Sequence, residues 1–290
     1  MTYFGTACHI LKVTEVDYMD NIKKILPENI RKYITKQTEE IRVKIGRPAI
    51  ILNRSSEVVL PELTTKKVFQ EILDSITEGS IYIFTEEINN GFITINGGHR
   101  VGLCGNAVVN DGKITAVKDI SGLNIRVARE IKGVGERLFR KITENNEIES
   151  AIIVSPPGCG KTTLLRDLTR LISDNISGTR ISLIDERCEL AASYAGCPQT
   201  DIGIRTDVFS GYPKREGVMQ AIRSMSPDII VVDEIGADIE SVKIAHFSGI
   251  KVIASMHGND FFNIPDIFKY GIRLAKNEEF DRVEEVVCLN

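Results

Sequence analysis

The stretch Ser155-Pro156-Pro157-Gly158-Cys159-Gly160-Lys161-Thr162-Thr163 decides which fold we expect for the second half of this chain. The apolar segment 151–154 precedes it, and leucines at helical spacing follow it. A strand, a glycine-containing loop that ends in Gly-Lys-Thr, and a helix together form a phosphate-binding loop (P-loop). In such a loop, backbone N–H groups and the positive end of the helix surround the phosphates. The whole stretch 155–163 is therefore predicted to bind a nucleotide.

Two side chains of this loop have distinct predicted roles. Lys161 is expected to reach the β- and γ-phosphates, and the hydroxyl of Thr162 is expected to bind Mg²⁺. Ser155 stands where the usual pattern begins with glycine, a residue favoured where the backbone approaches closely or has positive φ. We interpret the serine as harmless because the Gly-Lys-Thr end of the loop is intact. Weakened nucleotide binding is the alternative.

A pair of carboxylates, Asp233 and Glu234, follows the apolar segment 229–232. Consecutive apolar residues predict a buried strand, and its C-terminal end is expected beside the P-loop. Asp233 is predicted to hold Mg²⁺ together with Thr162, and Glu234 is predicted to polarise the water that attacks the γ-phosphate. Such a pair is a weak signal alone, but it is strong when it follows a P-loop in the same chain.

Two further predicted strands, 180–184 and 251–255, are also followed by polar groups. Asp185 and Glu186 follow the first strand, and Glu186 is a second candidate for activating water. His257 comes just after the other strand and is predicted to sense the γ-phosphate. In a parallel sheet these strand ends face one ligand crevice. The alternatives are a charged surface turn at 185–186 and a structural or surface histidine.

Short apolar strands alternate with helical patterns through residues 134–290. This alternation predicts an α/β domain in which helices cover both faces of a parallel sheet. Residues 19–133 show another pattern and are predicted to form a smaller α+β domain, with a joint at Gly133 and Gly135. Residues 1–18 match neither pattern and are expected to be a disordered leader; the alternative is an extension from a start codon upstream of a natural beginning at Met19.

The smaller domain is expected to combine short helices with an antiparallel sheet and tight turns. Helical spacing appears on both sides of Pro27 within 19–38, and again in 66–76. Glycines lie between or inside the predicted strands, as turns require. These strands are 41–45, 49–52, 81–84, 92–95 and 101–105.

Composition limits the classes of protein to which the chain can belong. Of its 290 residues 42% are apolar and 26% are charged, as in globular proteins. The net charge of −4 argues against a nucleic-acid partner, because such binders usually carry a basic surplus. The sequence shows neither a membrane-spanning apolar run nor a secretory signal, so we expect a cytoplasmic protein. The six cysteines lack zinc-type spacing and are expected to be reduced thiols.

Several blocks of the sequence resemble the stage III sporulation protein AA family. In the second half these blocks are 156–167, Ile184-Asp185-Glu186-Arg187, and 225–228 leading into 232–234. In the first half they are Gly97-Gly98-His99-Arg100-Val101-Gly102 and 124–129. The resemblance runs in order from about Met19 to the C-terminus. The glycine-histidine-arginine block is more specific than the P-loop.

This resemblance implies more than the residues themselves do. The family is similar to the ATPases of type II and type IV secretion and pilus machines, which implies a RecA-like P-loop domain that binds ATP with Mg²⁺. It also implies a homo-oligomeric, hexameric ring motor in the mother cell of a spore-former. That motor would lie at the cytoplasmic face of a membrane channel complex between mother cell and forespore.

The resemblance further implies that arginines neutralise charge in the transition state, as arginine fingers do. Such arginines come from the first domain or from a neighbouring subunit, and the expected loop 203–217 would border a subunit interface. For each arginine the alternative is a solvated surface charge. The candidates are Arg126 and Arg129, followed by Arg205, Arg215 and Arg223.

Three functions compete at this stage. The first is a secretion-type ring ATPase, and the second is a nucleotide-gated scaffold that binds ATP but hardly hydrolyses it. Ser155 favours the scaffold, whereas the carboxylates at 186 and 234 favour hydrolysis because binding alone does not require them. The third is a nucleic-acid motor, which the net negative charge and the lack of an aromatic and basic strand surface disfavour.

Overall fold

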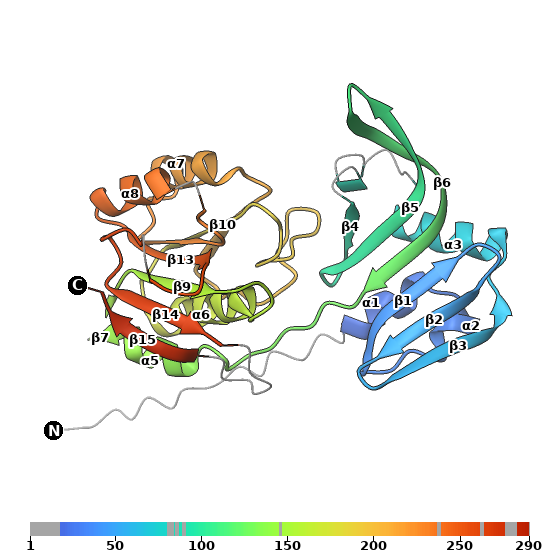
Figure 1. Cartoon of the computed structure of the whole chain (residues 1–290), viewed down its shortest axis with the longest axis horizontal. Helices are drawn as coiled ribbons and strands as arrows, with labels where there is room; N and C mark the ends of the chain where they lie inside the picture. Colours follow the sequence, from blue (N-terminus) through green and yellow to red (C-terminus); the bar gives the residue numbers. More distant parts are fainter. Residues whose placement is uncertain are drawn as a thin grey trace. The chain divides into compact units, whose positions relative to one another are not determined.

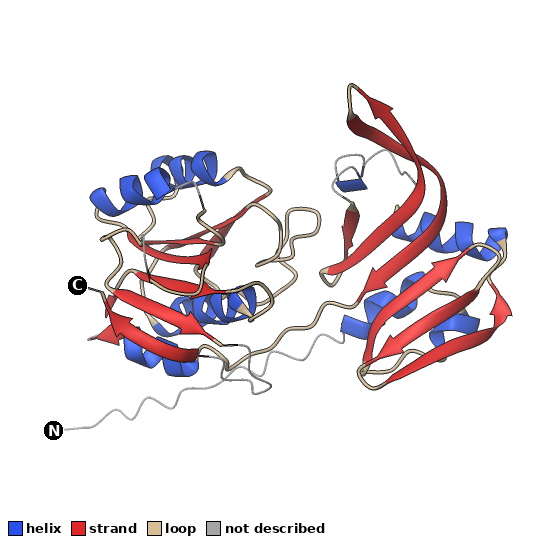
Figure 2. Ribbon diagram, in the orientation of Figure 1, coloured by secondary structure: helices blue, strands red, loops and turns tan. Residues whose placement is uncertain are grey.

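The chain folds into two compact units, Met1–Arg129 and Glu130–Asn290, which are described separately (Figures 1 and 2). The computed structural model describes residues 18–79, 84, 87–88, 91–144, 147–236, 239–261, 264–275 and 283–289. The predicted leader therefore lies outside the described residues, apart from its last residue. The division falls slightly before the predicted joint at Gly133. The reason is that Glu130 accepts the N–H of Asp201 at 2.9 Å, which ties this segment to the second unit.

The first unit is built on a six-stranded sheet in the order β3-β2-β1-β6-β5-β4, and every neighbouring pair is antiparallel. Its elements are α1 (Tyr18–Ile25), α2 (Glu28–Arg31), β1 (Thr38–Lys44), β2 (Pro48–Asn53), β3 (Ser56–Leu63), α3 (Lys66–Ile76), β4 (Phe92–Ile95), β5 (His99–Asn110) and β6 (Lys113–Arg126). The predicted helix 66–76 and the predicted strands 49–52, 92–95 and 101–105 lie within these elements. The predicted strand 41–45 runs one residue beyond β1, and the helical region predicted for 19–38 is helical only as far as Arg31. Strands β3 and β6 were not predicted, and the strand expected at 81–84 falls outside the described residues except for Phe84.

The glycine-histidine-arginine block has a structural role in this first unit. Gly97 and Gly98 have φ of 91° and 74° and form the turn between β4 and β5, a conformation that favours glycine. The ring of His99 is fully buried, and its Nδ1 accepts the backbone N–H of Ala128 at 3.0 Å. The block therefore shapes the β4–β5 hairpin and ties it to the chain that leaves β6.

The second unit contains a seven-stranded sheet in the order β11-β10-β12-β13-β9-β14-β15. All neighbours are parallel except β14 and β15, which pair antiparallel. The elements are α5 (Glu136–Ile142), β7 (Thr143–Glu144), β8 (Glu147–Ile148), β9 (Ala151–Ser155), α6 (Lys161–Asn175), β10 (Ile181–Asp185), β11 (Thr206–Ser210), α7 (Lys214–Ser224), β12 (Ile229–Val232), α8 (Ile239–Phe247), β13 (Lys251–His257), β14 (Tyr270–Leu274) and β15 (Val283–Cys288).

Alternate residues of β9 show how helices cover both faces of this sheet (Figure 2). Ala151 and Ile153 pack into one apolar cluster with leucines of α5 and α6. Ile152 and Val154 pack into another with residues of α7 and α8. All four are fully buried, and each isoleucine contributes about 2–3 kcal/mol by leaving water. The predicted α/β architecture, a largely parallel sheet between two layers of helices, is confirmed.

One sequence prediction in this unit was wrong. The segment 203–217 was expected to be a loop, but it contains β11 and the first turn of α7. The strand lies at the edge of the sheet, and only Phe209 of its five residues is buried. Such a strand lacks the continuous apolar run that identified its buried neighbours.

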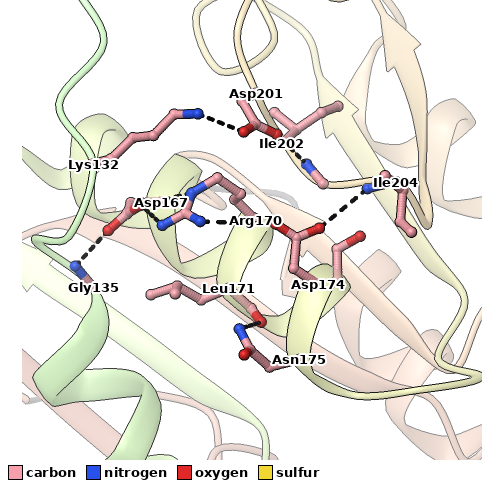
Figure 3. Close-up of polar contacts among 12 residues, drawn as sticks. Lys132, Gly135, Asp167, Arg170, Leu171, Asp174, Asn175, Asp201, Ile202 and Ile204 are labelled. Atoms are coloured by element: carbon pink, nitrogen blue, oxygen red, sulfur yellow. Dashed lines mark hydrogen bonds and ion pairs between the residues drawn. The ribbon is translucent and has the colours of Figure 1, made fainter. Parts of the chain in front are cut away.

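Helix α6 anchors two segments that are far apart in the sequence (Figure 3). The Asp167 side chain, 1% exposed, accepts the N–H of Gly135 at 2.8 Å and pairs with Arg170 at 2.6 Å. Two turns after Asp167, Asp174 accepts the N–H of Ile204 at 3.4 Å. The helix that begins at the P-loop is therefore fixed to the start of the second unit and to the chain before β11.

We expect Asp167→Ala to destabilise the second unit by about 3 kcal/mol, because it leaves a buried N–H without its acceptor and leaves the mostly buried Arg170 guanidinium with only its longer ion pair to Asp174, at 3.8 Å. The measurement is the urea midpoint of the unfolding transition of this unit. Arg140→Ala is the matched control, since Arg140 pairs with Glu136 on the exposed surface of α5. Its cost should stay below about 1 kcal/mol. Equal effects of the two variants would contradict the anchoring role.

Candidate functional site

The C-terminal ends of β9, β12, β13 and β10 meet at one edge of the parallel sheet. His257, the last residue of β13, lies opposite Ser155, the last residue of β9. Val232 lies between Ala254 and Ile184 in the strand register. This register brings the P-loop, Asp233, Glu234 and His257 together, as the sequence predicted for a single crevice. His257 ends β13 rather than following a strand.

The ammonium group of Lys161 is buried at the centre of the site, with 6% of the residue exposed. Its Nζ donates to the carbonyl oxygens of Ser155 and Pro156 at 2.9 and 3.2 Å. It also lies 3.3 Å from Ser155 Oγ and 2.9 Å from His257 Nδ1. Burial lowers the pKa of Lys161, while the carboxylates of Glu234 and Asp233 act in the opposite direction. The lysine therefore points back into its own loop.

The first turn of α6 lacks a side-chain cap. Its N-cap residue Gly160 has φ of 91° and makes no capping hydrogen bond. Gly158 also has positive φ, and a Cβ added there would meet nothing within 4 Å. Helix N-termini and such glycine turns present N–H groups to anions. Residues 156–158 are exposed, so this end of the loop is open to a phosphate.

Thr162 and Asp233 form the pair that fits a magnesium ion. Thr162 Oγ1 donates to one carboxylate oxygen of Asp233 at 3.2 Å, and Ser255 donates to the other. Burial raises the pKa of Asp233, an effect that the hydrogen bond from Ser255 opposes. Hydroxyl and carboxylate oxygens are ligands that Mg²⁺ prefers beside phosphates and waters. Within the described part of the chain no cluster of three or more His, Cys, Asp or Glu residues forms a metal site.

Glu234 is held between two nitrogen donors. His257 Nε2 lies 2.7 Å from one carboxylate oxygen, and Arg187 Nη1 lies 3.0 Å from the other. The ammonium group of Lys161 can only donate, so His257 Nδ1 accepts its hydrogen bond. The ring proton is then on Nε2, which donates a hydrogen bond to Glu234. A continuous chain of contacts therefore runs from Lys161 through His257 and Glu234 to Arg187.

The two acidic residues at the end of β10 behave differently. The Asp185 carboxylate accepts the backbone N–H groups of Glu189, Leu190 and Ala191 at 2.8–3.1 Å. Burial raises the pKa of Asp185, and these hydrogen bonds oppose the rise. Glu186 is partly exposed and pairs closely with Lys214, the first residue of α7. Asp185 thus holds the loop in shape, whereas Glu186 faces outward from it.

The predicted arginines are divided between the two units. Arg126 is exposed on β6, and Arg129 donates to the carbonyl of Thr38 at 3.0 Å, both within the first unit. Arg205 precedes β11 and Arg223 lies in the last turn of α7, so both lie at the sheet edge opposite the P-loop. Arg215 is exposed in the first turn of α7. A role for any of them toward a neighbouring chain stays a prediction.

Three contributors were missed from the sequence. Ser255 supports both residues of the acidic pair, because its Oγ donates to Asp233 and accepts the N–H of Glu234 at 3.0 Å. Arg187 and Lys214 pair with the two candidate bases. The position of Ser255 near a strand end was an available signal, as for His257. No such signal existed for Arg187 and Lys214, because their contacts depend on which strands pair in the sheet.

Comparison with known proteins identifies the family. The model of the family described as "Sporulation stage III, protein AA" matches residues 13–287. Stage III sporulation protein AA of Bacillus subtilis (strain 168) is 37% identical over 282 residues, which cover 92% of this chain and 91% of that protein. The chain belongs to the stage III sporulation protein AA family. The sequence resemblance is thereby confirmed.

This member of the stage III sporulation protein AA family has more distant relatives as well. The uncharacterized protein ycf45 of Cyanidium caldarium is 28% identical over 255 residues, covering 84% of this chain and 71% of that protein. Among solved structures, the Legionella pneumophila ATPase DotB superposes with a TM-score of 0.53 at 15% identity, covering 82% of this chain and 72% of DotB. The pilus retraction motor PilT gives a TM-score of 0.54 at 17% identity, covering 85% of this chain and 76% of PilT. These likenesses confirm the predicted RecA-like fold.

The structure accounts for the serine in the first P-loop position of this family member. Ser155 is fully buried at the end of β9 and is not among the described residues with positive φ. Its backbone therefore does not require glycine.

The described helices include none that is long and apolar enough to cross a membrane.

We expect Asp185→Asn to loosen the loop 186–191, because an amide group would point a donor at N–H groups that need acceptors. Amide hydrogen exchange at Glu189, Leu190 and Ala191 should accelerate about 10-fold or more, which corresponds to at least about 1.4 kcal/mol of local opening. Asp207→Asn, on the exposed side of neighbouring β11, is the control. Unchanged exchange in the Asp185 variant would show that the loop is held by other contacts.

Proposed function

We propose that this chain is an ATPase that hydrolyses ATP to ADP and phosphate with the help of Mg²⁺. The observation that carries the proposal is the convergence of Lys161, the Thr162–Asp233 pair and Glu234 at one edge of the sheet. Cationic, metal-binding and water-activating groups are the parts that phosphoryl transfer requires. Binding alone would need only the first two.

The proposed mechanism is in-line attack of water on the γ-phosphate. Lys161 leaves its own loop carbonyls to contact the β- and γ-phosphates, while the N–H groups at the start of α6 orient them. Thr162 and Asp233 would hold Mg²⁺, which neutralises charge on the phosphates. Glu234 orients the water and accepts its proton.

Glu234 is the preferred base, and Glu186 is the alternative. Glu234 contacts His257, whose other ring nitrogen contacts Lys161, so it is linked to the group expected on the γ-phosphate. The same link supports His257 as a sensor of that phosphate. Glu186 lies at the end of β10 and pairs with Lys214.

We further propose that the ATPase works as a homo-oligomeric, hexameric motor. Support comes from family membership and from a fold shared with the ATPase DotB and the pilus retraction motor PilT. The motor would act in the cytoplasm, peripheral to a membrane channel complex between mother cell and forespore. Arginine fingers would come from the first unit or from an adjacent subunit; the candidates are Arg126, Arg129, Arg205, Arg215 and Arg223.

A nucleotide-gated scaffold with little hydrolysis is the second candidate. One observation favours it: both possible bases, Glu186 and Glu234, are paired with cations in this structure. A carboxylate in an ion pair is a poor proton acceptor until the cation leaves. In the motor, nucleotide binding would separate one of these carboxylates from its cation, so that it can act as a base. In the scaffold, both carboxylates would stay paired.

The first test is phosphate release by the purified full-length chain with Mg-ATP over a protein concentration series. Turnover should rise with concentration, because arginines from neighbouring subunits complete the site. Lys161→Ala should lose ATP binding and reduce turnover at least about 100-fold, since it removes the charge that contacts the transferred phosphate. Binding without turnover at every concentration would contradict the motor and favour the scaffold.

Glu234→Gln and Glu186→Gln then identify the base. The variant that removes the base should retain ATP binding and lose about 10²–10⁴-fold in turnover. The control is the other variant of the pair, measured in the same assay. If neither substitution slows hydrolysis, both assignments of the base are wrong.

Ser155→Gly tests whether the serine at the first P-loop position is harmless, because it restores the glycine of the usual pattern. The substitution removes an Oγ that lies 3.3 Å from Lys161 Nζ. If the serine is harmless, ATP binding measured by isothermal titration should change by less than about two-fold, whereas tightening by about 2- to 5-fold, the effect of a fraction of one hydrogen bond, would support the alternative that Ser155 weakens binding. Weaker binding would show that the serine assists the nucleotide site.

A further inference from the structure

Neighbouring contacts hold the backbone next to Arg187, while its side chain is largely exposed. On its C-terminal side, Cys188 has φ of 51° and donates its N–H to the carbonyl of Asp185 at 3.2 Å. Arg166 of α6 donates to the carbonyls of Glu189 and Leu190 at 2.6 and 2.7 Å, which ties the same loop to the P-loop helix. The Arg187 side chain is nevertheless 64% exposed. The loop therefore has a fixed backbone, from which the long, charged Arg187 side chain extends.

The contact between Arg187 and Glu234 is easy to exchange. An ion pair with one largely exposed partner contributes only about 0–1 kcal/mol. The Glu234 carboxylate keeps its bond from His257 at 2.7 Å when the arginine leaves. Separation therefore costs little, provided that the guanidinium finds another anion.

A nucleoside triphosphate at the P-loop would supply that anion. Its γ-phosphate is expected near Lys161, which is joined to Glu234 through His257. A guanidinium can donate two parallel N–H bonds to phosphate oxygens, and a phosphate carries more negative charge than a carboxylate. The same phosphate charge repels Glu234, which weakens the original pair further.

We propose that Arg187 is a γ-phosphate-binding residue supplied by the same chain, which exchanges Glu234 for the γ-phosphate when a nucleoside triphosphate binds. This inference rests on the proposed ATPase function and deepens it. A diphosphate lacks the γ-phosphate, so Arg187 stays on Glu234 when ADP is bound. Only the triphosphate frees the carboxylate to accept a proton from water.

The test compares the binding of two nucleotides to the full-length chain by isothermal titration with Mg²⁺. The probes are ADP and the non-hydrolysable triphosphate adenylyl imidodiphosphate, so turnover is not needed. Arg187→Ala should weaken the triphosphate about 10- to 100-fold, the loss of a charge-assisted bond, and leave ADP within about two-fold. Arg187→Lys should lie between, because it keeps the charge and loses the paired donors.

Arg180→Ala is the matched control. Arg180 is also largely exposed and also pairs with a carboxylate, Asp228, at 2.7 Å. It precedes β10, so it lies at the sheet edge opposite the P-loop. Its replacement should leave the affinities for both nucleotides unchanged.

A second variant distinguishes contact of Arg187 with the γ-phosphate from loss of its ion pair with Glu234. Glu234→Gln should tighten triphosphate binding in the presence of Arg187, since no ion pair has to break, and this gain should vanish in the double variant with Arg187→Ala. Equal weakening of both nucleotides by Arg187→Ala, or no weakening of either, would overturn the proposal. If the wild type does not hydrolyse ATP but Arg187→Ala still selectively weakens the triphosphate, the ATPase function is overturned and the contact of Arg187 is upheld.

Discussion

The buried ammonium of Lys161 is the constraint around which the second unit is organised. A charge taken out of water is costly unless its surroundings compensate it. Its direct contacts are uncharged: two carbonyls, a hydroxyl and an imidazole. The compensating charges, Glu234 and Asp233, stand one step further away. The charge of Lys161 is therefore balanced within the protein by carboxylates that do not contact it directly, and it stays available for the proposed contact with a phosphate.

The compensating groups reach this cation only through strand register. Asp233 and Glu234 follow β12, while His257 ends β13, the strand between β12 and the P-loop strand. Ser255, two residues before His257, points to the acidic pair and fixes both of its residues. A shift of one residue in β13 would turn Ser255 and His257 to the opposite face. The buried faces of β9, β12 and β13 therefore set the chemistry as well as the stability.

The sequence could predict those parts of the fold that depend on continuous apolar runs. Strand 229–232 was predicted with its observed bounds because all four residues are buried between helix layers. Strand β11 was missed because its exposed edge position demands no such run. In the site, the residues of the loop and strand ends were predicted from local order. The contacts of Arg187 and Lys214 were not, because each joins segments whose proximity only the sheet order determines.

The ion pairs of the two candidate bases differ in how easily they separate, and this difference favours Glu234 as the base. The Lys214 side chain that holds Glu186 is 11% exposed, whereas the Arg187 side chain that holds Glu234 is 64% exposed. Separating a pair with a buried cation leaves that cation without compensation, which costs several kcal/mol. Separating an exposed pair costs about 1 kcal/mol or less. In the proposed mechanism a bound triphosphate would therefore release Glu234 far more readily than Glu186, and the Lys214–Glu186 pair is better suited to fixing the start of α7 beside the site.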